Sequence, residues 1–157
     1  MTGSFDFVST EDKPALIAFS TPEWLETAKT ALQELGYKVH TAATHSDFLV
    51  RFGQVHYQIV IVEELFAANN IEENLTLQAL QNMPVNQRRH ATIFLLGDSF
   101  QTLSPTEGFK YSVHAVVSSS EMFLLKQLVE KTVAENNLFL NSFREVQTRV
   151  YTSGTRL

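Results

Sequence analysis

The chain has 157 residues, of which 44% are hydrophobic and 18% charged, so it can bury one core and is not disordered throughout. Its net charge of -5, with 12 basic residues scattered among 17 acidic ones, argues against a domain that lies along nucleic acid. The absence of cysteine excludes a disulfide framework and any thiolate metal site.

Metal, membrane and export signals are also missing from the sequence. No histidine pair has the helical spacing of a zinc-peptidase motif, and the five histidines do not cluster: His40, His45, His56, His90 and His114. No stretch of eighteen apolar residues occurs, and the N-terminal residues lack the features of a signal peptide. We therefore expect a cytoplasmic protein with no metal, no cofactor and no contact with membranes or nucleic acid.

Residues 1–13 are a polar lead-in or linker, and a regular pattern begins at Pro14. Residues 15–19 form a continuous apolar run, which is typical of a strand buried on both faces of a parallel sheet. The hydroxyls of Ser20 and Thr21, followed by a proline, indicate the start of a helix that ends at Gly36. Residues 37–42 then predict a second strand.

The cycle repeats in the middle of the chain. Thr44, Ser46 and Asp47 can cap a second helix, and residues 57–62 are the clearest strand. A third helix is expected between Asn70 and Met83, closed by a proline. Its expected buried side consists of Ile71, Leu75, Ala79, Leu80 and Met83.

The last third of the chain contains two capping-box spacings. Residues 91–96 predict a fourth strand, and the first spacing, Ser104 with Glu107, opens a short helix that extends through Tyr111. Residues 113–117 predict a fifth strand. Ser118, three residues before Glu121, indicates the start of a long last helix.

Five strands that alternate with helices predict a three-layer α/β fold, with a doubly wound parallel sheet in the order 2-1-3-4-5. In such folds, ligands bind beyond the carboxyl ends of the strands. The residues expected at this edge are Ser20, Thr21, Glu63, Glu64, Gly97, Asp98 and Ser118.

From residue 14 to about residue 134, the order and lengths of these elements resemble the CheY-like receiver domain of bacterial response regulators. Residues 57–63 stand in the place of that family's third strand and its terminal aspartate. The resemblance implies two acids that hold magnesium, an aspartate nucleophile, a hydroxyl and a lysine. By strand position, these fall in turn on Phe19 and Ser20, Glu63, Gly97 and Ser118.

Only one carboxylate of that pocket survives, so we expect a degenerate phosphoacceptor pocket. Magnesium prefers anionic oxygen ligands, and Ser20 and Thr21 supply none. Glu63 is also one methylene longer than aspartate, so we expect no phosphorylation. Two alternatives stay open for this residue: Glu63 permanently imitates a phosphorylated aspartate, or Glu63 and Glu64 are solvated carboxylates at a strand end.

Two further groups could bind anions. Arg88 and Arg89 are possible anion contacts because guanidinium groups bind such oxygens in pairs, although a solvated turn explains them as well. The serines at 118–120 could form an anion site at a helix N-terminus, and helix capping is the alternative. No Gly-x-Ser-x-Gly motif and no glycine-rich phosphate loop occur, so we expect no enzyme activity.

The last helix is longer than one sheet edge requires. Residues 135–157 are interpreted as a helix extension and tail beyond a receiver-like domain at 14–134. The extension carries apolar residues spaced three and four apart, and these predict an interface: Leu140, Phe143, Val146 and Val150. A homodimer is expected, while the alternative is a segment that folds back onto Phe5 and Phe7.

The resulting hypothesis is a non-phosphorylatable, atypical pseudo-receiver that serves as a protein-interaction module in bacterial two-component signal transduction. The resemblance implies that unknown protein partners bind the face made by residues 104–111, residues 113–117 and the last helix. The alternative is a regulatory domain that binds a small anionic ligand or a nucleotide at the carboxyl edge of the sheet.

Overall fold

The computed structural model describes residue 9 and residues 11–155, with the side chains of 143, 144 and 147–155 excepted. Its centre is a five-stranded sheet in the order β2-β1-β3-β4-β5. Every neighbouring pair of strands is parallel. The predicted fold is therefore confirmed, and the strands are β1 (Pro14–Ala18), β2 (Lys38–Ala42), β3 (Ile59–Glu63), β4 (Thr92–Gly97) and β5 (Ala115–Ser118).

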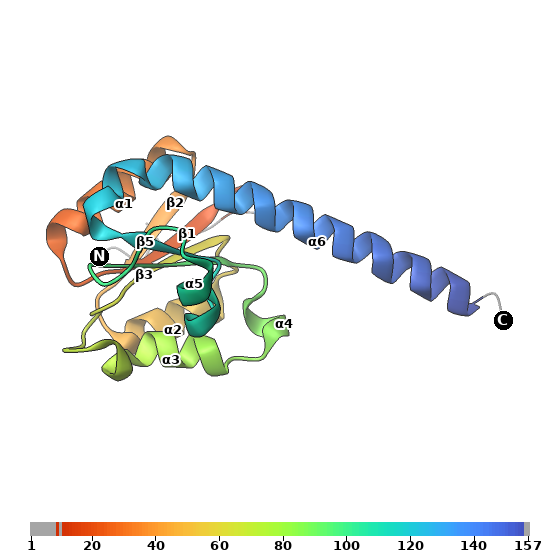
Figure 1. Ribbon diagram of the computed structural model, residues 1–157, viewed down its shortest axis with the longest axis horizontal. Coiled ribbons are helices and arrows are strands. Elements are labelled where there is room, and N and C mark those ends of the chain that lie inside the picture. The colour runs from red at the N-terminus through yellow and green to blue at the C-terminus, as the bar shows by residue number, and fades with distance from the viewer. Residues whose placement is uncertain (1–8, 10, 156–157) are drawn as a thin grey trace.

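Helices cover both faces of this sheet (Figure 1). On one face, α1 (Pro22–Glu34) and α6 (Leu125–Thr155) pack against alternate strand residues such as Ile17 and Ile61. On the other face, α2 (His45–Gln54), α3 (Leu75–Asn82) and α5 (Pro105–Tyr111) pack against the intervening residues. The short helix α4 (Val85–Arg88) connects α3 to β4. Because each strand is buried on both sides, it reads as a continuous apolar run.

The helix expected between Asn70 and Met83 is divided in two, and its predicted buried face is partly wrong. A 3₁₀ helix, η2 (Ile71–Glu73), is followed by α3, whose buried residues are Thr76, Leu77 and Leu80. Leu75 is 55% exposed. The cause is Asn74, which is fully buried and donates its side-chain amide to the carbonyls of Glu63 and Glu64. This anchor restarts the helix at Leu75 and changes which residues face the sheet.

The start of the last helix also differs from the prediction. A 3₁₀ helix, η3 (Ser119–Leu124), precedes α6, and Glu121 inside it has a non-helical backbone. The Ser118 side chain makes no capping hydrogen bond, so the capping box expected there is wrong. The caps expected at Thr44 and Ser104 are present, since each accepts a hydrogen bond from the amide three residues later.

Helix α6 has 31 residues and is about 46 Å long. Its first turns are buried on the sheet through Leu125, Leu128 and Val129. Contacts with the domain continue through Thr132, which is buried, and Asn136, which donates to the Thr92 hydroxyl. The outer part of the helix then extends away from the domain (Figure 1). The alternative in which the segment meets Phe5 and Phe7 concerns residues that lie outside the described part of the chain. Among the described helices, none combines the length and the apolar character needed to cross a bilayer.

Candidate functional site

Glu63 closes β3 at the carboxyl edge of the sheet and is bound by the loop that enters α1. Its Oε1 atom accepts hydrogen bonds from the backbone amides of Ser20 and Thr21, each at 3.0 Å. Its Oε2 atom accepts the hydroxyl of Thr21, also at 3.0 Å. The residue is only 4% exposed. The interpretation of Glu63 as a solvated carboxylate is therefore wrong.

The extra methylene of glutamate accounts for this contact. It carries the carboxylate from the end of β3 to the β1–α1 loop, where α1 begins with unpaired amides and a favourable dipole for negative charge. Thr21 is the residue that precedes α1, and its hydroxyl makes no cap of its own helix because it donates to Glu63. The carboxylate thus stabilises the join between β1, β3 and α1 instead of pointing toward solvent.

Glu64 occupies the space in which a hydroxyl would follow β4. A Cβ atom added to Gly97 would lie 2.7 Å from the Cβ atom of Glu64 and still closer to its carboxylate. Real Cβ atoms do not approach so closely, so the position excludes serine and threonine unless Glu64 moves. Gly97 is required here by the neighbouring side chain, a reason that sequence alone could not give.

Ser118 stands at the position of the receiver lysine, and it makes hydrogen bonds to neighbouring hydroxyl groups. The amide of Ser118 donates to the Thr102 hydroxyl at 2.9 Å, and its own hydroxyl pairs with that of Ser120. The hydroxyl of Ser119 donates to the Asp98 carboxylate. These serines therefore bond to one another and to Asp98, and none of them supplies a positive charge.

Thr21, Gly97 and several acidic residues border a hollow of about 530 Å³ at the carboxyl edge of the sheet. Glu63, Glu64, Glu72 and Asp98 line it, and none of the described lining residues is Lys or Arg. A hollow with four carboxyl groups and no cation repels an anion at neutral pH.

A second ring of contacts supports the loop after β3, and sequence reasoning missed it. The Ser20 hydroxyl accepts the amide of Ala67 at 2.8 Å. His45 lies between Ala67 and α3: its Nε2–H group donates to the Ala67 carbonyl, and its Nδ1 atom accepts the amide of Thr76. Both His45 and Asn74 stand in polar stretches of sequence, where nothing distinguishes a structural contact from a solvated side chain.

The residues present do not fit a magnesium ion of the receiver type. Both oxygens of Glu63 are already hydrogen-bonded. The two positions that would carry acids are Phe19, which is buried in the core, and Ser20. In the described part of the chain, no three acidic or histidine side chains are grouped as metal ligands.

The two arginines at the start of β4 have different environments. The Arg88 guanidinium donates to the Ser112 carbonyl at 3.0 Å, so it holds the C-terminal end of α5. Arg89 makes no ion pair with any described residue and lines a separate cavity together with Leu140. Of the other predicted interface residues, Val146 is 56% exposed, while the side chains of Phe143 and Val150 lie outside the described residues.

Solved structures place this fold among receiver domains. No family model and no curated protein matches the chain. A protein of Chloroflexus aurantiacus J-10-fl assigned as a response regulator has 17% identity and a TM-score of 0.63, with 79% of this chain and 99% of that one covered. The chemotaxis response regulator CheY4 of Vibrio cholerae has 16% identity and a TM-score of 0.59 over 77% and 98%. A CheY-like receiver domain protein of Methanospirillum hungatei JF-1 has 16% identity and a TM-score of 0.62 over 81% and 98%.

The chain therefore has the CheY-like receiver fold of response regulators. At this edge it carries none of the magnesium-binding acids, the hydroxyl or the lysine that the resemblance implies.

Proposed function

We propose that this protein is a cytoplasmic pseudo-receiver in bacterial signalling, which binds protein partners and neither accepts a phosphoryl group nor acts as an enzyme. The observation that carries the proposal is the hydrogen-bonded state of Glu63. Phosphoryl transfer to a carboxylate needs a free oxygen nucleophile and cations that neutralise the transferred group. Here both oxygens of Glu63 accept hydrogen bonds, and three further carboxyl groups line the same hollow.

The face that receivers use for partners carries an unusual aromatic residue. Phe109 on α5 is 89% exposed, and it borders a hollow of about 500 Å³ that Val85, Arg88 and Arg89 also line. An exposed phenylalanine beside cationic side chains suits a protein segment that presents an apolar group next to a carboxylate. We assign partner recognition to this surface of α5.

Dimerisation is assigned to the outer part of α6. Along this helix, Leu125, Val129, Thr132 and Asn136 follow one another at spacings of four and three and face the domain. The same spacing continues through Phe139, which is 66% exposed, and Val146, which is 56% exposed. In the sequence, Phe143 and Val150 complete this alternation.

Such a repeat of three and four residues averages 3.5, which is the repeat of a two-stranded coiled coil. The stripe that packs on the domain in the first half of α6 has no partner among the described residues in the second half. A second copy of the chain brings an identical stripe to a two-fold axis, so a homodimer covers both.

Light scattering on the intact chain tests the dimer. The wild type should have the mass of a dimer, and the double variant Phe139→Glu/Val146→Glu should be a monomer because it places charges in the apolar stripe. Phe123→Glu is the matched control, since Phe123 is 76% exposed but lies outside the extension. A monomeric wild type, or a double variant that remains dimeric, contradicts the assignment.

The alternative, a small anionic ligand at the carboxyl edge, is disfavoured by the charge of that hollow. A thermal shift produced there by a nucleotide, and abolished by changes at Glu64 or Asp98, would favour it instead.

A further inference from the structure

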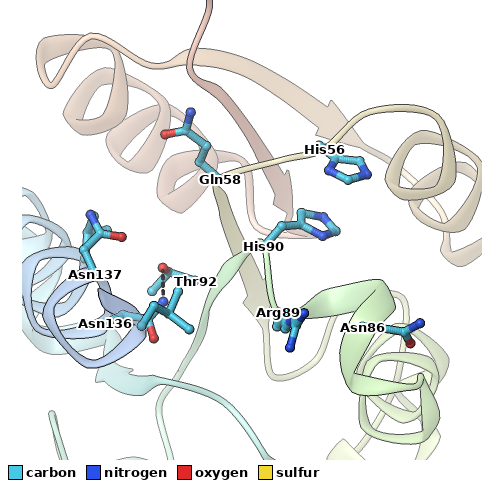
Figure 2. A pocket seen from close by; sticks show the side chains of 10 residues that line it. His56, Gln58, Asn86, Arg89, His90, Thr92, Asn136 and Asn137 are labelled. Atoms are coloured by element: carbon cyan, nitrogen blue, oxygen red, sulfur yellow. Dashed lines mark hydrogen bonds between the residues drawn. The ribbon is translucent and has the colours of Figure 1, made fainter. Parts of the chain in front are cut away.

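A second cavity lies at the opposite, amino-terminal edge of the sheet, remote from the degenerate acceptor pocket. It has a volume of about 510 Å³, within the usual range for small-molecule sites. Three segments form its walls, as Figure 2 shows: the residues before β3, α4 with the turn that leads to β4, and α6. They contribute His56 and Gln58, Arg89 and His90, and Asn136 and Asn137 in turn.

The charge of this cavity is the reverse of that at the carboxyl edge. It is lined by one guanidinium group, two imidazoles and several side-chain amides, and none of the described lining residues is Asp or Glu. The whole chain has a net charge of -5, so this combination is a local exception. The lining offers hydrogen-bond donors and positive charge to a ligand, without a carboxylate that would compete for them.

The two arginines are separated by their contacts. Arg88 is held by the Ser112 carbonyl, whereas Arg89 has no ion pair with a described residue. Arg89 is solvent-exposed and lies at the side of the cavity where α4 ends. Its guanidinium can therefore bind an oxyanion without breaking an ion pair to any described residue.

The histidines supply the second independent observation. The rings of His56 and His90 stack with centroids 4.3 Å apart. The Nε2 atom of His90 is buried and has no hydrogen-bond partner among the described residues, which is costly in a folded protein. Burial lowers the pKa of His90, and the charge of His56 lowers it further. An anion beside this stacked pair offsets the cost of charging His90 and can accept a hydrogen bond from an imidazole.

We propose that this cavity binds a small phosphate-bearing ligand, with Arg89 as the principal anion contact and His56 and His90 beside it. Asn136 and Asn137 contribute from α6, and Asn136 is positioned by its hydrogen bond to the Thr92 hydroxyl at 3.2 Å. The site lies at the opposite edge of the sheet from the acceptor pocket.

Nuclear magnetic resonance titration of the intact chain tests the proposal, with inorganic phosphate and adenosine 5′-monophosphate as the probes. The imidazole nitrogens of His56 and His90 and the side-chain amides of Asn136 and Asn137 should shift and saturate. Arg89→Gln should weaken binding by about tenfold or more, as expected for the loss of a charge-assisted contact. Arg88→Gln, the matched control, removes the same charge one residue away and should change the affinity less than about threefold.

Asn137→Asp provides a second variant, since Asn137 is exposed and its change adds a carboxylate to the cavity without disturbing the core. It should weaken phosphate binding about as strongly as Arg89→Gln. Tighter binding of the nucleotide than of phosphate identifies a nucleotide ligand, and equal binding identifies the phosphate group as the recognised part. The proposal is overturned if neither probe gives saturable shifts, if the shifts centre elsewhere, or if Arg88→Gln and Arg89→Gln weaken binding equally.

Discussion

We expect substitutions of Glu63 to show that its carboxylate has a structural role. The order of stability among the variants distinguishes this role from that of a phosphoacceptor. Glu63→Ala removes three hydrogen bonds and leaves the amides of Ser20 and Thr21 without their acceptor. Since part of that loop can be hydrated, we expect a cost of about 2–4 kcal/mol in the free energy of unfolding. For a chain of this length, that corresponds to a decrease in Tm of roughly 5–12 °C.

The two conservative variants should behave in opposite ways. Glu63→Gln keeps an oxygen in the same place and should cost only about 1 kcal/mol, because the Thr21 hydroxyl can turn to accept from the new amide. Glu63→Asp withdraws the carboxylate by about 1.5 Å, so it loses the 3.0 Å contacts and should resemble alanine.

Urea unfolding followed by circular dichroism measures these differences in the free energy of unfolding. An unchanged m-value shows that each variant still unfolds in a two-state transition. Glu72→Gln, an exposed carboxylate at the same edge, is the control and should change stability by less than about 0.5 kcal/mol. The reasoning is refuted if Glu63→Asp is as stable as the wild type or more stable than Glu63→Gln, since aspartate would then fit the site.

Two further predictions follow from contacts near the strand ends. Gly97→Ser should cost about 1–3 kcal/mol in unfolding experiments because its Cβ atom meets both the Cβ atom and the carboxylate of Glu64. Glu64→Gly in the same chain removes both groups and should recover most of the loss; additive effects of the two changes would contradict the contact. Burial, with a contribution from Arg88, lowers the pKa of His114, whose Nδ1 atom accepts the Ile93 amide. Between the ordinary pKa of 6.5 and the lowered pKa of the folded state, the unfolded chain binds more protons than the folded chain. The free energy of unfolding therefore decreases as the pH falls below about 6.5. His114→Asn keeps an acceptor but does not titrate, so the decrease in Tm between about pH 8 and about pH 5.5 should be smaller than in the wild type, and an equal decrease would count against this role.

The fold could be predicted from the sequence because its strands are buried on both faces. Short, β-branched apolar runs such as residues 59–63 are typical of buried strands. Their alternation with helices leaves few possible sheet topologies. Helix phase was less predictable. The spacing of apolar residues places Leu75 on the buried side, but one buried asparagine, Asn74, interrupts the helix and determines which side faces the sheet.

The site was predictable in its composition and not in its contacts. The missing acids and lysine can be read directly at Ser20 and Ser118, because strand ends are easily located. The direction of the Glu63 side chain depends on amides of a loop 42 and 43 residues away, which no local pattern encodes. The cavity beside Arg89 likewise combines segments that are distant in sequence, so the arginine pair alone could not separate a structural residue from a ligand contact.

Intact-mass spectrometry after incubation with acetyl phosphate and magnesium tests the central claim most directly, with an ordinary receiver domain treated alongside. We predict that the ordinary receiver gains the mass of one phosphoryl group and that this chain remains unmodified, because the Glu63 oxygens are held by Ser20 and Thr21. A phosphoryl group that appears on the wild type and is absent from Glu63→Gln would contradict the account.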